Sequence, residues 1–385
     1  MLFDPLDSDP EVTDLFISHA HYDHARGYEF PIQKKRSTKE TLELYEADTG
    51  RKVGNWREIR RGRRLRLGDV EVEAHDAGHV LGAVQYEVIT PQGTVVYASH
   101  INFTDTLLSR AAEIAPCDLL VIEATYPATA KSGPRESVIA DIVKWALECI
   151  RDHMIPAFVT DTIGNAQELV KILNQWTEAP VIVHPRIARI NKVYESNWIG
   201  LRYTDASSEE ALNMIEESRC VVIVPRRFDT TRYGNFKTAH VSGRAGTLRD
   251  SENELFLLND QANLDELLRF VKEARPKSVL TFHGASDLFS RMISKRLGIQ
   301  ARQITTEPLR KKTQAIKLDE TRILTLEDRL IGFIQTPGFT YEKRDLMTLG
   351  LKEGFKITEV EEALLRLTRN GVLKYSSTTD GYSVP

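Results

Sequence analysis

The chain has 385 residues and a formal net charge of −4 at pH 7, with 41% apolar and 28% charged residues. One hydrophobic core rarely grows beyond about 250–300 residues, so this length predicts two or three domains, and the composition excludes a disordered or fibrous protein. The near balance of 51 basic and 55 acidic residues excludes a strongly basic surface, so any nucleic acid has to bind to local patches.

The first 125 residues contain short apolar or β-branched runs bounded by Gly, Asp and Pro, which is the pattern of strands and turns. The middle of the chain alternates helical spacing with short buried-strand runs, so we predict an α/β (α+β) protein. The expected strands are residues 12–18, 70–74, 84–89, 95–98, 119–122, 180–184, 220–225 and 278–282, and the expected helices are residues 139–150, 166–173, 264–274 and 287–297.

The C-terminal part differs in kind from the rest. Residues 310–320 are polar and are expected to be a linker. Helical patterns follow at 324–334, 343–351 and 358–369, and then two strands around a polar turn, which is the pattern of a winged helix. Residues 322–385 carry nine basic and nine acidic side chains, so this domain fits docking to a protein partner as well as reading of DNA.

The cysteine content and the lengths of the apolar runs bear on where in the cell the protein is found. Three widely spaced cysteines argue against a disulfide framework and for a reducing environment. No run reaches the roughly 18 apolar residues of a membrane-spanning helix, and the N-terminus lacks the pattern of a signal peptide. We therefore expect a cytoplasmic protein without a membrane partner.

The densest chemical signal is the sequence SHAHYDH at residues 18–24, directly after the first predicted strand. Loops at the carboxyl ends of strands are where α/β proteins usually build their sites. Four metal-binding side chains fall within six positions here, and zinc takes imidazole nitrogen and carboxylate oxygen at about 2.0–2.2 Å. The two histidines at i and i+2 can converge on one ion, and the following aspartate and histidine can serve a second. A lone histidine is more often structural, but this cluster is too dense for that interpretation.

The motif resembles the metal-binding loop of the metallo-β-lactamase superfamily, and later segments resemble its β-CASP nuclease branch over about residues 3–300. FDPL before the cluster and HARG after it are most similar to ligase-associated DNA exonucleases and Artemis-like repair nucleases. The mRNA 3′-end-processing factors and ribonuclease J are more distant. The resembling segments are DAGHVLGA at 76–83, IEATY at 122–126, IPAF at 155–158, NAQEL at 165–169, VSGRA at 241–245 and FHG at 282–284.

The resemblance implies a four-layer αββα metallo-β-lactamase core that carries an inserted α/β domain of the β-CASP type. It also implies metal-dependent hydrolysis of phosphodiester bonds in DNA or RNA, of the exonucleolytic kind, in nucleic-acid processing or repair. A small-molecule metallo-hydrolase is disfavoured, because such enzymes lack the long insert-like stretch between Glu123 and His283. The implied domains are the core at 1–144, the insert at 145–262, the return of the core at 263–308, a linker at 309–321 and a winged-helix-like domain at 322–385.

A two-metal site follows from the same resemblance. Two ions polarise a phosphodiester and lower the pKa of a shared water toward about 7. Zinc is the expected metal, in one or two copies, with manganese as the alternative. Glu123 would orient a neighbouring catalytic side chain. The implied ligands are His19, His21 and His79 for one ion, and Asp23, His24 and His283 for the other.

Two positions depart from the family's pattern. His100 is a candidate ligand that stands where a bridging aspartate is expected, and one imidazole nitrogen binds one ion but cannot bridge two. Gln261 stands where close relatives have a histidine in a role resembling a general acid, and glutamine cannot donate a proton at useful pH. Asn263 falls where those relatives have an acidic residue. Two functions stay open: a working nuclease with Asp23, Glu123 and Gln261 at its catalytic positions, and a catalytically impaired paralogue that binds nucleic acid or scaffolds a processing complex.

Basic residues supply candidate contacts for nucleic acid. In the sequence WREIRRGRRLR at residues 56–66, alternation along a strand would make a phosphate-facing row of arginines, and the alternative is a solvated hairpin face. Phosphate contacts carry no base information, so the sequence favours neither DNA nor RNA, and it leaves the oligomeric state open. The candidate contacts are Arg57, Arg60, Arg61, Arg63, Arg64, Arg226, Arg227, Ser242, Gly243 and Arg244.

Overall fold

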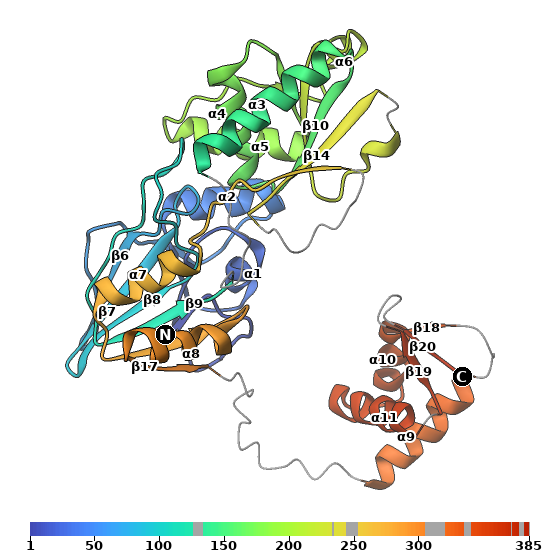
Figure 1. Ribbon diagram of the computed structural model, residues 1–385. Coiled ribbons are helices and arrows are strands. Elements are labelled where there is room, and N and C mark those ends of the chain that lie inside the picture. Colours follow the sequence, from blue (N-terminus) through green and yellow to red (C-terminus); the bar gives the residue numbers. More distant parts are fainter. Residues whose placement is uncertain are drawn as a thin grey trace. The chain divides into compact units, whose positions relative to one another are not determined.

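The computed structural model describes residues 1–125, 134–232, 235–243, 253–304, 320–334, 340–370, 372–376 and 381–384 (Figure 1). The chain divides into two compact units, Met1–Thr305 and Thr306–Pro385, which are described separately. The linker expected at 309–321 lies outside the described residues, apart from positions 320 and 321 at the start of a helix. No helix in the described ranges is long and apolar enough to cross a membrane.

A seven-stranded mixed sheet forms the centre of the larger unit, in the order β17-β16-β9-β8-β7-β6-β5. Strands β8, β9, β16 and β17 run parallel, whereas β5 to β8 are antiparallel neighbours. The five strands predicted in this region are confirmed to within two residues at each end. The strands are β5 Leu65–Leu67, β6 Val70–Asp76, β7 Val84–Thr90, β8 Gly93–Ala98, β9 Leu119–Glu123, β16 Ser278–Phe282 and β17 Gln300–Gln303.

A four-stranded parallel sheet, in the order β1-β2-β3-β4, packs against this sheet through aromatic side chains. The rings of Phe3 and Phe16 stack with centroids 5.1 Å apart, and Phe16 meets Tyr86 edge-on at 5.3 Å. Such pairs add about 0.5–1.5 kcal/mol beyond the burial of their area. The strands are β1 Leu2–Phe3, β2 Asp14–Phe16, β3 Lys34–Ser37 and β4 Trp56–Glu58.

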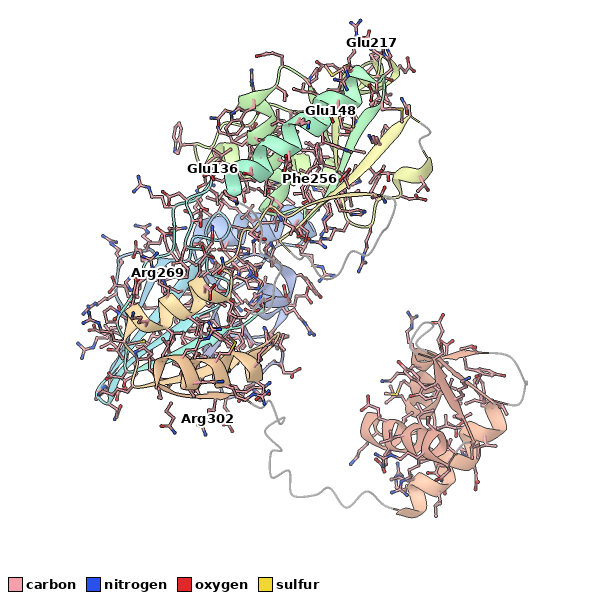
Figure 2. All side chains as sticks on the ribbon, viewed as in Figure 1. Glu136, Glu148, Glu217, Phe256, Arg269 and Arg302 are labelled. Atoms are coloured by element: carbon pink, nitrogen blue, oxygen red, sulfur yellow. The ribbon has the colours of Figure 1, made fainter. Side chains whose placement is uncertain are left out.

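Helices cover the outer faces of the two sheets, which gives the predicted αββα order of layers. On the four-stranded sheet lie α1 (Tyr22–Ala25), the 3-10 turn η1 (Arg26–Glu29) and α2 (Lys39–Thr49). On the seven-stranded sheet lie α7 (Leu264–Ala274) and α8 (Ser286–Leu297). Helix α7 buries one apolar face, while Arg269 on its outer face pairs with Glu273 four residues later (Figure 2).

Between β9 and α7 the chain forms a separate six-stranded parallel sheet, in the order β12-β11-β13-β10-β14-β15 (Figure 1). Its central strands are continuous apolar runs because helices cover them on both faces. The strands are β10 Ile155–Thr160, β11 Val181–Val183, β12 Thr204–Asp205, β13 Val221–Pro225, β14 Phe236–Val241 and β15 Glu254–Phe256. The helices are α3 Arg135–Arg151, α4 Asn165–Trp176, α5 Pro185–Ser196, α6 Glu209–Glu216 and the 3-10 turn η2 Thr230–Arg232.

Helix α3 packs on this second sheet. Its Trp145 contacts Phe158 of β10 and Phe256 at the end of β15, with ring centroids 5.2 Å and 5.8 Å apart (Figure 2). The boundary expected at residue 145 therefore falls inside a helix that belongs with the insert. The same boundary already falls inside the helix expected at residues 139–150.

In its described residues, the smaller unit contains three helices and a three-stranded antiparallel sheet in the order β18-β20-β19. Its core includes Leu326 and Leu330 of the first helix, Leu346 of the second and Leu364 of the third. The predicted helices are confirmed to within four residues, and the two predicted strands gain a third, short partner. The elements are α9 Glu320–Phe333, β18 Tyr341–Glu342, α10 Lys343–Lys352, α11 Ile357–Arg369, β19 Lys374–Ser376 and β20 Gly381–Ser383.

Replacing Gly78 with alanine is expected to destabilise the larger unit by several kcal/mol. Gly78 has φ +72°, and a Cβ there would lie 2.3 Å from the carbonyl oxygen of Asn102 and 2.6 Å from the amide nitrogen of Ala112, which are backbone atoms and cannot turn away. Gly50 is a matched control, because it has φ +71° with no atom within 4 Å of the same Cβ. Gly50→Ala should cost only about 1 kcal/mol of left-handed backbone strain. Thermal unfolding of the two variants measures the difference, and equal losses would contradict a steric role.

Candidate metal centre

Side chains that can bind a metal converge at the sheet edge where parallel strands end. The three histidines of the SHAHYDH motif follow β2, while His100 follows β8, Glu123 ends β9 and His283 follows β16. His79 comes from the turn between β6 and β7. The carboxyl ends of parallel strands usually form the site in α/β proteins, because their loops open on the same side. The fold therefore brings residues from five separate segments to one place.

One ligand nitrogen from each of four histidines lies within 4.8 Å of the other three. The members of this four-histidine cluster are His19, His21, His79 and His100. Their ring centroids are 4.7–6.1 Å apart, and all but His21 are buried. The structure thus joins the three histidines expected to share one ion, and it adds His100 to them.

Each ring of the cluster makes a hydrogen bond on the nitrogen that faces outward. These bonds fix the ring orientations, as is usual around metal-binding histidines. The bonded pairs are His19 Nδ1 with Ser18 Oγ at 2.8 Å, His21 Nε2 with the Ile163 carbonyl oxygen at 3.3 Å, His79 Nδ1 with the Asp260 carbonyl oxygen at 2.8 Å, and His100 Nε2 with Glu123 Oε1 at 3.1 Å.

A second group, formed by His24, Glu123 and His283, adjoins the cluster. Oε1 of Glu123 lies 3.4 Å from Nδ1 of His283, and Oε2 lies 3.7 Å from Nε2 of His24. Burial alone would raise the pKa of Glu123, but His100 and the other two histidines hold it well below the ordinary carboxyl value. Glu123 is therefore an ionised carboxylate that connects the two groups.

Asp4 directly follows β1 and contacts Ser18 and His24 of the metal-binding motif. It was not predicted as a site residue from the sequence. Its carboxylate accepts hydrogen bonds from the backbone N–H of Ser18 at 2.7 Å and from Oγ of Ser18 at 2.5 Å. It also lies 3.0 Å from Nδ1 of His24 and accepts from the hydroxyl of Tyr97 at 3.2 Å. The available signal was the FDPL segment, whose acidic residue ends a strand that pairs in parallel with β2.

The charge of each imidazole is set by burial and by its neighbours. Burial lowers the pKa of His19 and His79 well below the ordinary value, and the surrounding imidazoles lower it further. Burial acts in the same direction on His24, but the hydrogen bond and charge of Asp4 outweigh it and raise the pKa of His24 to about 9. At neutral pH, in the metal-free centre, the rings of His19 and His79 are therefore neutral, whereas His24 is an imidazolium paired with Asp4.

The free energy of unfolding of the metal-free protein is expected to fall as the pH rises from about 6.5 to about 9. The folded-state pKa of His24 lies above its ordinary value of 6.5, so its pairing with Asp4 stabilises fully below about pH 6.5 and is lost as the pH rises through about 9. Urea unfolding with a chelator across this range measures the slope. Asp4→Asn removes the charge and should flatten the slope, and an unchanged slope in that variant would contradict the assignment.

The donor set fits a divalent cation that prefers nitrogen. Nε2 of His19 and Nε2 of His24 are buried and have no hydrogen-bond partner in the part of the chain that the structure describes. Nδ1 of His21 lies only 3.1 Å from Nε2 of His79. Buried polar atoms are normally satisfied, so these nitrogens indicate an absent binding group. Imidazole suits zinc, copper and nickel, whereas magnesium, calcium and manganese prefer oxygen.

A cavity of about 170 Å³ opens beside the cluster. Asp23 lines it, but its carboxylate is 61% exposed, lies 3.7 Å from Nε2 of His24 and joins no metal-binding group among the described residues. The amide nitrogen of Gln261 lies 3.1 Å from Nδ1 of His100. A larger cavity of about 920 Å³ along α3 contains none of the predicted site residues. The smaller cavity is lined by His21, Tyr22, Asp23, His100, Asp161, Gly243, Asp260 and Gln261.

Two aspartates of this cavity, Asp161 and Asp260, were not singled out from the sequence. Burial raises the pKa of Asp260 to about 6. Its carbonyl oxygen holds His79, as described above, so the strand-to-helix connection before α7 helps to build the centre. Isolated acidic residues in loops carry no sequence signal, and only the fold brings these two together.

The arginines of residues 56–66 do not form one row, which corrects the prediction of a single strand or hairpin. Arg57 lies in β4 of the four-stranded sheet, whereas Arg66 lies in β5 of the seven-stranded sheet, because the chain crosses between the sheets near Gly62. Carboxylates also offset much of the positive charge. Arg60 pairs with Glu58, Arg61 with Glu40 and Asp76, and Arg64 with Glu71 and Glu73, while Arg57 and Arg63 are exposed.

Arg226 lies where strands of the insert sheet end. Its guanidinium donates two hydrogen bonds to Asp161, at 2.5 Å and 2.7 Å, and a third to Oγ of Ser242 at 2.8 Å. This arrangement places a cation beside the cavity, although Asp161 neutralises it. Of the other predicted contacts, Arg227 is exposed, Gly243 lines the cavity and Arg244 lies outside the described residues.

Curated proteins with names from nucleic-acid metabolism are similar to the chain. It is 26% identical over 303 residues to a probable DNA ligase from Opitutus terrae, covering 74% of this chain and 28% of that protein. It is 25% identical to cleavage and polyadenylation specificity factor subunit 3 from Dictyostelium discoideum, over 47% of this chain and 28% of the relative. It is also 25% identical to an RNase J-like protein from Methanocaldococcus jannaschii, over 51% of this chain and 53% of the relative. The chain thus spans about a quarter to about half of these relatives.

No family model matches the chain. Among solved structures, the crystal structure of a protein of unknown function from Enterococcus faecalis superposes with a TM-score of 0.53 at 14% identity, covering 79% of this chain and 81% of that one. That likeness supports the fold alone. Several of the relatives are named as nucleases or as subunits of RNA-processing factors, and the metal-binding segments of this chain follow the order of the motifs described above. The names of these relatives indicate the β-CASP nuclease branch of the metallo-β-lactamase superfamily, which is the family that the sequence motifs resemble.

Proposed function

We propose that the chain is a metal-dependent nuclease that hydrolyses phosphodiester bonds. The observation that carries this proposal is the convergence of imidazoles and ionised carboxylates from five segments beside a cavity lined by both the core and the insert. Relatives named as RNases from Methanocaldococcus jannaschii and Saccharolobus solfataricus support the same reaction class.

The four-histidine cluster would hold the ion, and zinc suits its nitrogen donors better than manganese does. When bound, such an ion polarises a phosphodiester and supplies a nucleophile near neutral pH. Glu123 orients His100, and Asp4 holds His24 in place. The amide of Gln261 can donate a hydrogen bond to a phosphate oxygen, but it cannot supply a proton to a leaving group.

DNA is the favoured substrate class, with exonucleolytic cleavage in repair. The relative named as a probable DNA ligase matches 74% of this chain, whereas the RNA-processing relatives match 47% and 51%. The smaller unit would act as a winged helix that docks on a protein partner, since its charges balance. The three buried free cysteines fit a cytoplasmic location.

A catalytically impaired binding subunit is the second candidate function. The observations that favour it are His100 and Gln261, which replace a bridging carboxylate and a proton donor. An impaired protein would bind DNA in a salt-dependent way without cleaving it.

The test is cleavage of end-labelled single-stranded DNA, double-stranded DNA and RNA by the purified chain. Cleavage of DNA should require a divalent ion, should stop with a chelator and should fall on the order of 100-fold or more in His21→Ala. His75→Ala is the matched control, because His75 pairs with Glu87 and Glu113 outside the centre, and it should keep full activity. Activity that survives His21→Ala unchanged would contradict the proposal. Binding without cleavage would favour the impaired subunit.

A further inference from the structure

We propose that His19, His21, His79 and His100 form a closed four-imidazole site for one nitrogen-preferring divalent cation, with Glu123 as the positioning residue of His100. The proposal rests on the proposed function, since it concerns the same centre. Cleavage at a four-imidazole site would require the ion to take a fifth ligand, as zinc does in some transition states. It concerns how many ions the centre holds, and it assigns His100 as the ligand that closes the first coordination shell.

The hydrogen bonds around the cluster decide which nitrogen of each ring carries a proton. The carbonyl oxygens of Ile163 and Asp260 only accept, so His21 donates from Nε2 and His79 donates from Nδ1. Oγ of Ser18 gives its own proton to Asp4 and therefore accepts from Nδ1 of His19.

The same reasoning applies to the fourth ring, because Oε1 of Glu123 lies 3.1 Å from Nε2 of His100 and a carboxylate oxygen accepts. One nitrogen in each ring is thus left with a lone pair. The four unprotonated atoms are Nε2 of His19, Nδ1 of His21, Nε2 of His79 and Nδ1 of His100.

These lone pairs have almost no protein groups to satisfy them. Nε2 of His19 has no hydrogen-bond partner among the described residues. Nδ1 of His21 and Nε2 of His79 face each other at 3.1 Å, which is repulsive between two lone pairs unless a cation lies between them. Nδ1 of His100 lies 3.1 Å from the amide nitrogen of Gln261, which can donate to it. The lone pairs of His19, His21 and His79 therefore lack a donor, and that of His100 would exchange the Gln261 amide for the cation. Four imidazole nitrogens match the number of ligands that zinc prefers in closed protein sites.

The adjoining group offers a second ion the unpartnered Nε2 of His24, but its carboxylate is already engaged. Oε1 of Glu123 is already engaged by His100 and by the hydroxyl of Thr125, and it also faces His283. Asp23 lies 3.7 Å from Nε2 of His24, but its side chain is mostly exposed. No carboxylate occupies position 100 to join two ions, so a second ion would have to displace existing hydrogen bonds. We therefore expect one tightly bound ion per chain.

Metal titration of the purified full chain tests this. After removal of metal with a chelator, competition with a chromophoric chelator should give one zinc ion per chain, and the absorption spectrum with Co²⁺ should be that of a tetrahedral four-nitrogen site. His100→Ala should weaken zinc binding on the order of 100-fold or more, and Glu123→Gln on the order of 10–100-fold. Both variants should also change the Co²⁺ spectrum, which a merely structural role would leave intact. His75→Ala should bind zinc like the unmodified chain.

Two ions of equal affinity in the unmodified chain would overturn the proposal, and so would zinc affinity in His100→Ala within about threefold of the original. The first result needs no variant and decides the question even if His100→Ala does not fold. A protein with one ion, a four-nitrogen spectrum and no cleavage would remove the proposed function and leave this inference standing. A protein that cleaves DNA and binds two ions would support the proposed function and overturn this inference.

Discussion

Asp4→Ala is expected to lower the free energy of unfolding of the metal-free protein by about 3–5 kcal/mol. The Asp4 carboxylate is buried and faces a His24 ring that is itself fully buried and protonated at neutral pH. Removing the carboxylate takes away the nearest counter-charge of that ring and leaves Glu123 and Asp23, each 3.7 Å from it. It also removes the acceptor for the backbone and hydroxyl groups of Ser18. Chemical unfolding at pH 7 with a chelator measures the loss.

Two controls separate the charge of Asp4 from its position near the N-terminus. Asp7→Ala changes an exposed aspartate three residues later and should alter stability by less than about 0.5 kcal/mol. Asp4→Asn keeps an acceptor but loses the charge, so its loss should lie between those of the two alanine variants. A cost below about 1 kcal/mol for Asp4→Ala would show that Asp4 does not support the centre.

The double substitution His100→Asp with Gln261→His is expected to raise the rate of DNA cleavage by about 100-fold or more. The aspartate opens the closed imidazole shell and supplies a carboxylate that can join two ions. The histidine supplies a proton donor, and positioned acid–base groups contribute about 10²–10⁴-fold. Gln261 already lies 3.1 Å from His100, so the new side chains would fall at adjoining positions. Single-turnover cleavage of labelled DNA measures the gain.

The two single substitutions are the controls for this gain. Because positions 100 and 261 are in contact, their effects should not add, and each alone should give much less than the double change. Metal content should rise toward two ions in every variant that carries Asp at position 100. No gain from the double change would show that these positions do not correspond to a bridge and a proton donor.

The long buried strands and amphipathic helices were predictable from the chain alone. Strand β16 and helix α7 have the predicted bounds, because alternation and helical periodicity of apolar residues are strong signals. The short strand β3 was not predicted. β3 reads KKRS, which looks like a charged surface segment, yet its Arg36 is buried in an ion pair with Asp14 at 2.7 Å. Tertiary contacts override local composition at such positions.

The candidate centre was predictable where ligands are dense in sequence and not where they are sparse. The SHAHYDH motif and the family resemblance led to all four members of the cluster. No site role was predicted for Asp4, Asp161 and Asp260, because each is a single acidic residue whose role depends on partners far along the chain. The exposure of Asp23 and the ion pairs of the arginines of residues 56–66 likewise depend on tertiary packing, which the spacing of residues in the sequence does not predict.

The pairing of β9 with β16 has a consequence for the order in which the polypeptide is completed. These neighbours are separated in sequence by the whole insert, so β9 presents an unpaired edge on the ribosome until Phe282 has emerged. An unpaired apolar edge promotes aggregation. Early folding of the insert would shorten the effective loop between β9 and β16 and so favour their pairing. His283 emerges immediately after β16, so closure of that edge and delivery of the last imidazole of the centre are one event during synthesis.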